Sequence, residues 1–452
     1  MSLTLQRYQI KDPVHIAPLA IFRVIFGAVM TIATVRFILK GWVYEQYIKP
    51  GFYFPYFGFE WVKPLDATGM YAVFTIMAIS YLMVMIGWRY RFAVIVSFIT
   101  FTYVELIDKT NYLNHYYFIS IINFLLIFLP ANRYFSVDVR LNPALLLERV
   151  PTWMVDVIRW QLAIVYIYAG IAKLNSDWLF NAMPLKIWLP AHSHLPLIGS
   201  FLTQEWTAYV FSWFGAAYDL FIVFFLWNAR TRPAAYMFVI IFHALTAWLF
   251  PIGMFPYVMI FSTLIFFPED FHLRLIRLWR RFIPVKNISP ASGASLGISR
   301  NHRWIMALMV IHFTIQVLLP WRFLLYPGNL FWTEQGYRFS WRVMLMEKAG
   351  TAFFYVRDGA SGRESEVNNN DYLTRNQEKM MATQPDMILQ FAHHIHNVYR
   401  EKGMADPHVR VESYATLNGS GSRTFIDHSV NLAAESESFR PKHWILPYTP
   451  MP

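Results

Sequence analysis

Long apolar runs constrain the fold of this chain more than any other feature of its sequence. Eight runs approach or reach the length of a membrane-spanning helix, about 17 to 25 residues, and a ninth is shorter. The eight lie at residues 16–38, 71–87, 91–107, 113–130, 157–174, 209–227, 233–250 and 303–325, and the ninth lies at 254–267. The chain is 56% hydrophobic and only 15% charged, which is too apolar for a soluble domain. We therefore predict a polytopic α-helical membrane protein, embedded in a lipid bilayer, with about nine spans in residues 1–325.

Basic residues in the loops predict the orientation of these spans. If the N-terminus is cytoplasmic, most loop lysines and arginines fall on the cytoplasmic side, as the positive-inside rule requires. The cytoplasmic set is Arg7, Lys11, Arg89, Arg91, Arg133, Arg140, Arg149, Arg230, Arg232, Arg274, Arg277, Arg280, Arg281, Lys286 and Arg300. The outer set is Lys40, Lys49, Lys63, Lys109 and Lys186. An odd number of spans then places residues 326–452 outside the cytoplasm, and the net charge of +11 gives no reason to expect nucleic-acid binding.

Residues 326–452 have the pattern of a folded α+β domain. TAFFYVRDGASGRESEV predicts two strands around a turn, and HVRVESYATLNGSGSRTFID repeats this pattern around residues 418–422. Between them lies a predicted amphipathic helix that starts near Pro385 and ends before Gly403. Its apolar face is formed by Ile388, Phe391, Ile395 and Val398.

The chain contains no cysteine, which excludes disulfides, thiolate nucleophiles and cysteine-ligated metals. HHIH at residues 393–396 places His393 and His396 three residues apart on a helix. However, Ile395 belongs to the apolar face and no carboxylate completes a ligand set, so we expect no metal. No phosphate-binding loop, nucleotide fingerprint or serine-hydrolase elbow is present. Any chemistry must therefore use nitrogen and oxygen groups.

Lys173 ends the apolar run YIYAGIAK, at the predicted outer end of its span. In one interpretation its long side chain reaches the membrane interface and pairs with Asp177, four residues on. In the other, a desolvated pocket disfavours the charged ammonium and supplies an amine base near neutral pH. Because a pairing with Asp177 favours the charged form, the two interpretations oppose each other.

Three further polar residues fall at the same side of the predicted membrane. Asn114 and His115 lie at the outer mouth of the fourth span, and His243 lies in the outer half of the seventh. An interfacial position among tyrosines would explain His115 without a function, but with Asn114 it also offers donors and acceptors at a membrane mouth. His243 is costly in a membrane unless it faces a cavity or a partner. Together with Lys173, these residues are expected to converge beneath the outer domain.

Seven stretches together resemble one family: LIDKTNYLNHYYF, ANRYFSVD, AGIAKLNSDW, FPIGMFPYVM, YRFSWRVM, YVRDG and SRTFID. In their order, over about residues 15–445, the chain resembles the vitamin K-dependent γ-glutamyl carboxylases and their bacterial relatives. These membrane enzymes use a reduced naphthoquinone, O2 and CO2 to convert peptide glutamates to γ-carboxyglutamate, while the quinol becomes its epoxide. The resemblance implies location in a bacterial inner (plasma) membrane.

The resemblance also implies roles for single residues. Lys173 falls on the family's catalytic lysine, which deprotonates the quinol, and Asn114 and His115 fall on the pair beside the reacting glutamate. His243 falls on the family's membrane histidine, and Arg423 on a position that would hold a substrate carboxylate. The residues that fall on walls of the quinol pocket are Phe250, Met254, Phe255, Trp341 and Met344.

The implied reaction is a relay, because an amine cannot remove a proton from the γ-carbon of glutamate. Oxidation of the quinol generates a much stronger base, which survives only where water is excluded. The implied cofactor is reduced vitamin K or a menaquinol-type naphthoquinol without a metal. The implied partners are a glutamate-containing peptide or protein substrate and a quinone reductase for recycling.

The chain departs from animal family members, which often carry a second lysine where Ala172 stands, have a disulfide, and extend beyond the matched region. We therefore expect the surface that holds a substrate propeptide to be altered or missing. Two alternatives stay open: a quinol oxygenase that forms the epoxide without carboxylating protein, and a non-catalytic quinone- or lipid-binding membrane protein.

Overall fold

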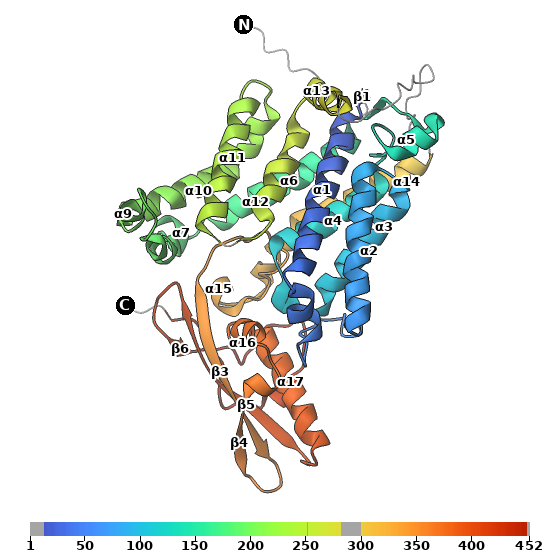
Figure 1. Cartoon of the computed structure of the whole chain (residues 1–452). Coiled ribbons are helices and arrows are strands. Elements are labelled where there is room, and N and C mark those ends of the chain that lie inside the picture. The colour runs from blue at the N-terminus through green and yellow to red at the C-terminus, as the bar shows by residue number, and fades with distance from the viewer. Residues whose placement is uncertain (1–12, 251, 282–299, 450–452) are drawn as a thin grey trace.

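The computed structural model describes residues 13–250, 252–281 and 300–449, with side chains from residue 303 in the last range. Figure 1 shows a bundle of helices at one end of the molecule and a sheet with its own helices at the other. Arg7, Lys11 and Lys286, which entered the orientation argument, lie outside the described residues, as does the side chain of Arg300.

Among the residues that the structure describes, seven helices are long and apolar enough to cross a membrane. They are α1 (Ala17–Leu39), α2 (Ala67–Ile86), α3 (Tyr90–Ile107), α6 (Trp153–Ala172), α10 (Glu205–Trp227), α11 (Arg232–Leu249) and α14 (Arg300–Leu318), which a 3₁₀ turn continues to Leu325. Two shorter apolar helices occupy the remaining predicted runs, α4 (Asn114–Phe128) and α12 (Phe255–Ser262). The prediction of a helical bundle is therefore confirmed, whereas nine membrane crossings stay a prediction.

Helix boundaries follow local capping. α2 begins at Ala67, several residues before the apolar run, because the Asp66 carboxylate accepts a hydrogen bond from the Gly69 N–H. It ends at Gly87, whose φ of 68° suits glycine. Hydrophobicity marks the part of a helix that fits the membrane, whereas the cap determines where the helix starts.

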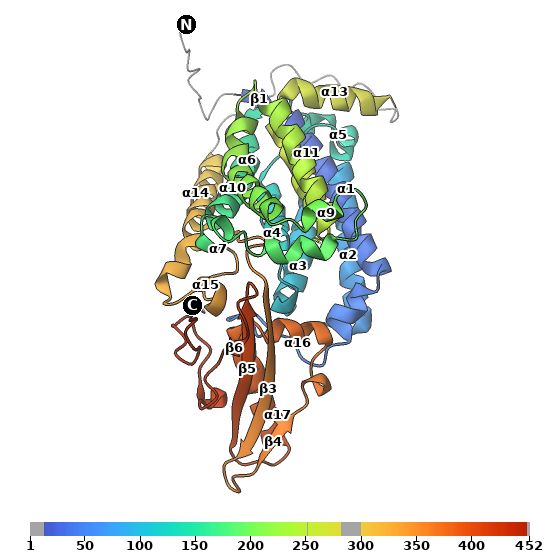
Figure 2. The same cartoon turned by 90° about the vertical axis from the view of Figure 1, so that its left-hand side faces the viewer.

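Short elements connect the long helices. They are β1 (Pro13–His15), α5 (Val137–Leu141), β2 (Arg149–Pro151), α7 (Ser176–Leu179), α8 (Leu185–Trp188), α9 (Gly199–Leu202), α13 (Glu269–Arg280) and α15 (Leu330–Thr333). β1 pairs antiparallel with β2. In Figure 2, α13 lies across the end of the bundle opposite the sheet.

The C-terminal region forms an antiparallel sheet in the order β4-β3-β5-β6. Its elements are β3 (Lys348–Asp358), β4 (Glu364–Val367), α16 (Arg375–Met381), α17 (Pro385–Glu401), β5 (Pro407–Leu417) and β6 (Arg423–Thr424). Ile388, Phe391 and Ile395 of α17 are buried, and the Phe391 ring lies 4.9 Å from that of Phe354 in β3. Both predicted hairpins and the predicted amphipathic helix are confirmed.

The bundle and the sheet region share a hydrophobic core. One buried cluster lies within the bundle, and a second runs from the helix ends into the sheet. The second cluster includes Ala172, Trp178 and Leu249 together with Phe354 and Phe391. The ends of α6 and α11 are therefore packed against the C-terminal region.

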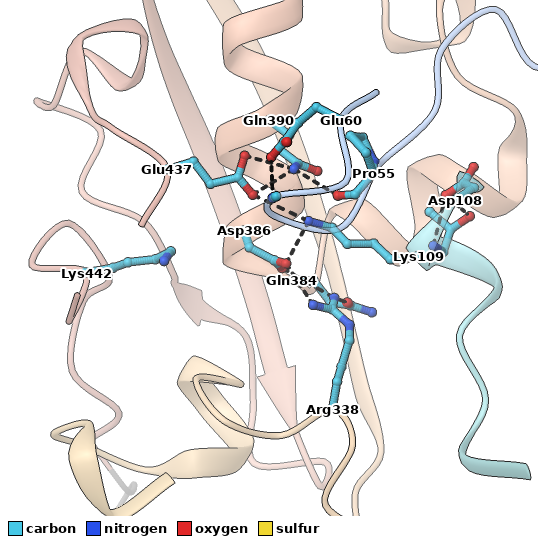
Figure 3. Close-up of polar contacts among 12 residues, drawn as sticks. Pro55, Glu60, Asp108, Lys109, Arg338, Gln384, Asp386, Gln390, Glu437 and Lys442 are labelled. Carbon is cyan, nitrogen blue, oxygen red and sulfur yellow. Dashed lines mark hydrogen bonds and ion pairs between the residues drawn. The ribbon is translucent and has the colours of Figure 1, made fainter. Parts of the chain in front are cut away.

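A cluster of buried charges also joins the two regions, and Figure 3 shows it around Asp386 at the start of α17. The Asp386 carboxylate lies 2.8 Å from Lys109 Nζ, which comes from the loop before α4, and 2.7 Å from Arg338 Nη1. Gln384 accepts a further hydrogen bond from Arg338. Burial raises the pKa of Asp386, but Arg338 and Lys109 outweigh it and hold that pKa well below its usual range. We call Lys109, Arg338 and Asp386 the Asp386 cluster.

Candidate active site

Lys173 is buried and paired with a carboxylate from another helix. α6 ends at Ala172, and the Lys173 Nζ lies 2.6 Å from Oδ2 of Asp219, near the middle of α10. The side chains of Lys173 and Asp219 are only 7% and 8% exposed. Lys173 Nζ also donates to the Ala169 carbonyl at 3.3 Å. Burying two charges in contact is far less costly than burying either alone.

Close packing of α6 against α10 makes this contact possible. A Cβ built on Gly170 would lie 2.7 Å from the Leu220 backbone nitrogen, much closer than ordinary packing allows. Leu220 follows Asp219 directly, so the approach at Gly170 brings the carboxylate within reach of the lysine. Glycine is required here for close approach of two backbones.

The interpretation in which Lys173 pairs with Asp177 is wrong. The α6 helix has ended before Asp177, and the Asn175 side chain starts a new short helix, α7, by accepting from the Trp178 N–H. Asp177 therefore no longer has helical spacing to Lys173. Its carboxylate instead accepts a hydrogen bond from Asn418 Nδ2 at 2.9 Å, at the tip of the β5–β6 hairpin. This hydrogen bond connects the C-terminal region to the segment that follows Lys173.

A small cavity of about 90 Å³ lies beside the Lys173–Asp219 pair. His243 of α11 lines it, and its Nε2 lies 3.2 Å from the Tyr166 hydroxyl. The other ring nitrogen, Nδ1, is buried without a hydrogen-bond partner in the part of the chain that the structure describes. The aromatic part of the lining is Tyr166, Trp178, Trp188, Phe211, Phe242, Phe250 and Phe255. The cavity therefore combines apolar walls with an amine, a carboxylate and an unpartnered imidazole nitrogen.

A large cavity of about 670 Å³ holds Asn114 and His115. Asn114 Nδ2 donates to the Arg342 carbonyl at 2.8 Å, and its Oδ1 accepts from the Tyr112 hydroxyl at 3.0 Å. Asn114 thereby fastens the start of α4 to the segment at 337–344. His115 makes no hydrogen bond within the described residues, and its ring lies 5.7 Å from that of Phe255. Hydrogen bonds therefore constrain the His115 side chain less than that of Asn114.

The two cavities share a wall, because four residues belong to both linings. Ile252, Phe255, Val343 and Met344 line both of them. The Phe255 ring stands between the two histidines, 5.7 Å from His115 and 5.8 Å from His243. All four predicted catalytic residues are therefore brought to two neighbouring chambers. Phe250 lines the small cavity, Met254 the large one, and Phe255 and Met344 line both.

Two predicted site residues line neither cavity as the structure describes them. Trp341 is buried and stacks on Tyr117 with ring centroids 4.9 Å apart. Arg423 donates to the Ser420 hydroxyl at 2.8 Å and lies over the Tyr448 ring at 5.0 Å. Their predicted contacts with quinol and with a substrate carboxylate stay predictions.

The histidines of HHIH make hydrogen bonds to backbone. His393 Nε2 lies 2.7 Å from the Glu435 carbonyl, and His396 Nδ1 lies 2.7 Å from the Pro407 carbonyl. Within the described ranges, no three His, Asp or Glu side chains group as metal ligands would. These histidines therefore contribute to the packing of α17.

Sequence reasoning missed Asp219. It lies 46 residues from Lys173, so no spacing rule connects them. One signal was available, because Asp219 is a lone carboxylate within the apolar run GAAYDLFIVFF. An ionisable residue within a membrane span is a functional candidate by default.

These features define a class: a membrane protein whose apolar helices enclose a buried amine–carboxylate pair and two adjoining cavities beside an α+β region. Residues 11–271 match the family model described as the HTTM domain. Residues 301–450 match the vitamin K-dependent gamma-carboxylase lumenal domain. The chain belongs to the vitamin K-dependent gamma-carboxylase family, as its sequence resemblance predicted. No solved structure matches it.

Proposed function

We propose that this protein oxidises a reduced naphthoquinone, either vitamin K or a menaquinol-type quinol, to its epoxide. We propose further that it couples this oxidation by O2 to the addition of CO2 at the γ-carbon of glutamate in a peptide or protein. One observation carries the proposal: an apolar cavity with a buried amine adjoins a larger cavity that polar side chains also line, and four residues line both. A reaction that joins a lipid-soluble quinol to a peptide needs two such chambers.

The side chains around the small cavity suit a quinol ring chemically, but the volume of the cavity is too small for one. Its aromatic walls suit a fused ring, and Lys173 and the free Nδ1 of His243 are available to the ring hydroxyls. However, about 90 Å³ is less than the roughly 150 Å³ of a cavity that binds benzene. A naphthoquinol must therefore displace part of the shared wall, where Phe255 and Met344 open towards the large cavity.

The residues of this chain would hold the ring, move its proton and exclude water. When bound, reduced naphthoquinol supplies the strong base on oxidation by O2. Lys173 Nζ would take a hydroxyl proton, with Asp219 beside the resulting ammonium. His243 would meet a ring oxygen through Nδ1. The apolar wall around them keeps water from quenching a strong base.

The large cavity would receive the glutamate side chain. His115 faces it without a partner among the described residues and would donate to or accept from the reacting carboxyl group. Asn114 would act indirectly, because its side chain fastens the segment at 337–344 to the start of α4. We also propose that the C-terminal region lies outside the cytoplasm, on the outer side of a bacterial plasma membrane, where a peptide reaches it and a quinone reductase regenerates the quinol.

The test uses the purified full-length protein in nanodiscs with reduced naphthoquinone, O2, labelled bicarbonate and a glutamate-containing peptide. Epoxide and peptide-bound label are measured together, for the wild-type protein and for Lys173→Ala. Both products, lost in the variant, support the proposal. Epoxide without label favours a quinol oxygenase, and neither product from folded protein that binds quinone favours a carrier. Epoxide formation unchanged by Lys173→Ala contradicts the role of Lys173.

A further inference from the structure

We propose that Asp219 is a ligand-binding residue: one of its oxygens holds Lys173, and the second oxygen receives a ligand hydroxyl. This inference rests on the proposed function, and it gives a role to a residue outside the predicted site. It makes Asp219 and Lys173 a functional pair, comparable to a catalytic base with an orienting carboxylate.

The geometry of the carboxylate supports both parts of this role. Oδ2 of Asp219 lies 2.6 Å from Lys173 Nζ. Oδ1 makes no hydrogen bond within the described residues, although Asp219 lines the small cavity. One oxygen therefore holds the lysine, and the other is free to accept from a hydroxyl in the cavity. A charged acceptor forms a stronger hydrogen bond than a neutral one.

The pair also holds the amine in place. Lys173 Nζ lies 5.3 Å from the centroid of the Trp178 ring, and Trp178 Nε1 donates to the Ser212 carbonyl in α10. α10 therefore carries Asp219 and holds Trp178, the two side chains that lie beside the ammonium. Without the carboxylate, the flexible lysine side chain loses its strongest contact.

Binding of 1-naphthol and of 1-methylnaphthalene tests the second oxygen. The two probes differ only in a hydroxyl against a methyl group. Asp219→Asn should weaken 1-naphthol about threefold or more and leave 1-methylnaphthalene unchanged, which also shows that the cavity is intact. Unchanged binding of 1-naphthol to a variant that still binds 1-methylnaphthalene overturns the proposal.

Asp219→Glu decides the matter if the asparagine variant loses the cavity. This variant keeps a charged acceptor, so its preference for 1-naphthol over 1-methylnaphthalene should stay within about threefold of wild type, and loss of that preference overturns the proposal. Neither binding assay needs O2, CO2, a peptide or turnover. Failure of the proposed carboxylation would therefore leave these results standing, and failure of these assays would leave the carboxylation untouched.

Discussion

Two lysine–aspartate pairs with a buried lysine lie within the described residues, and they are built differently. In the Asp386 cluster, one carboxylate is shared by Lys109 and Arg338, and Arg338 also contacts Gln384. Beside the small cavity, Asp219 contacts Lys173 alone through one oxygen and leaves the other open. A carboxylate with two cations is fixed in its charge state, whereas a one-to-one pair facing a cavity can exchange a partner with a ligand. The first arrangement suits structure and the second suits chemistry.

The largest expected effect is the difference in activity between a Lys173 variant and a Lys109 variant. Lys173→Met should lower quinol epoxidation by about 10² to 10⁴-fold, the usual contribution of a general base. Lys109→Met removes a buried lysine that pairs with Asp386 and lines the large cavity, which Lys173 does not line, and this change should lower epoxidation less than about tenfold per folded molecule. Initial epoxide rates, normalised to folded protein by size-exclusion chromatography, make the comparison. Equal losses in the two variants would mean that both pairs serve the same purpose.

A second prediction concerns a variant that separates Lys173 from Asp219 without substituting either residue. Gly170→Ala places a methyl group 2.7 Å from the Leu220 nitrogen, which forces α10 away from α6. Since small displacements of a catalytic group are costly, epoxidation should fall by up to about 10²-fold. Gly51→Ala is the control, because Gly51 lines neither cavity and its Cβ would meet only the Tyr372 carbonyl oxygen at an ordinary 3.7 Å. A Gly170→Ala variant as active as Gly51→Ala would show that the 2.6 Å contact is dispensable.

A third prediction concerns the stability of the Asp386 cluster. Asp386→Asn leaves two cations without their carboxylate and should lower the free energy of unfolding by about 2 kcal/mol at pH 7, since the site is partly exposed. The pKa of Asp386 is lowered in the folded protein, so its stabilisation is complete above the ordinary value and is lost as pH falls through the folded one. The difference between wild type and variant should therefore narrow below about pH 4. Chemical unfolding followed over pH provides the measurement, and a difference that grows in acid would contradict it.

The smallest effect is expected at Arg423, which lines neither cavity within the described residues. Arg423→Ala removes hydrogen bonds at the β5–β6 hairpin and should destabilise the protein by about 1 kcal/mol. The rate of epoxidation at saturating quinol should not change. Peptide titrations test the sequence-based expectation, because a substrate-binding arginine would raise KM for the peptide and leave the KM for quinol unaltered.

Sequence periodicity predicted the helices, both hairpins and α17, because each depends on nearby residues. The partner of Lys173 was beyond that reasoning, since the contact depends on how α6 and α10 pack at Gly170. The segment at 337–344 was also unpredictable. Phe339, Trp341 and Met344 all have positive φ, a conformation that these residue types disfavour. Tertiary contacts, such as the stacking of Trp341 on Tyr117, impose this conformation against local preference.

The wall that Phe255 and Met344 form between the cavities has a consequence for timing. Phe255 and Met344 line both chambers, and changes of side-chain rotamer are far faster than a typical turnover. A short-lived base produced on one side would then meet glutamate on the other before it meets bulk solvent. If no glutamate occupied the large cavity, the same base could react only with water that enters the site. Efficient use of quinol should therefore depend on which chamber fills first.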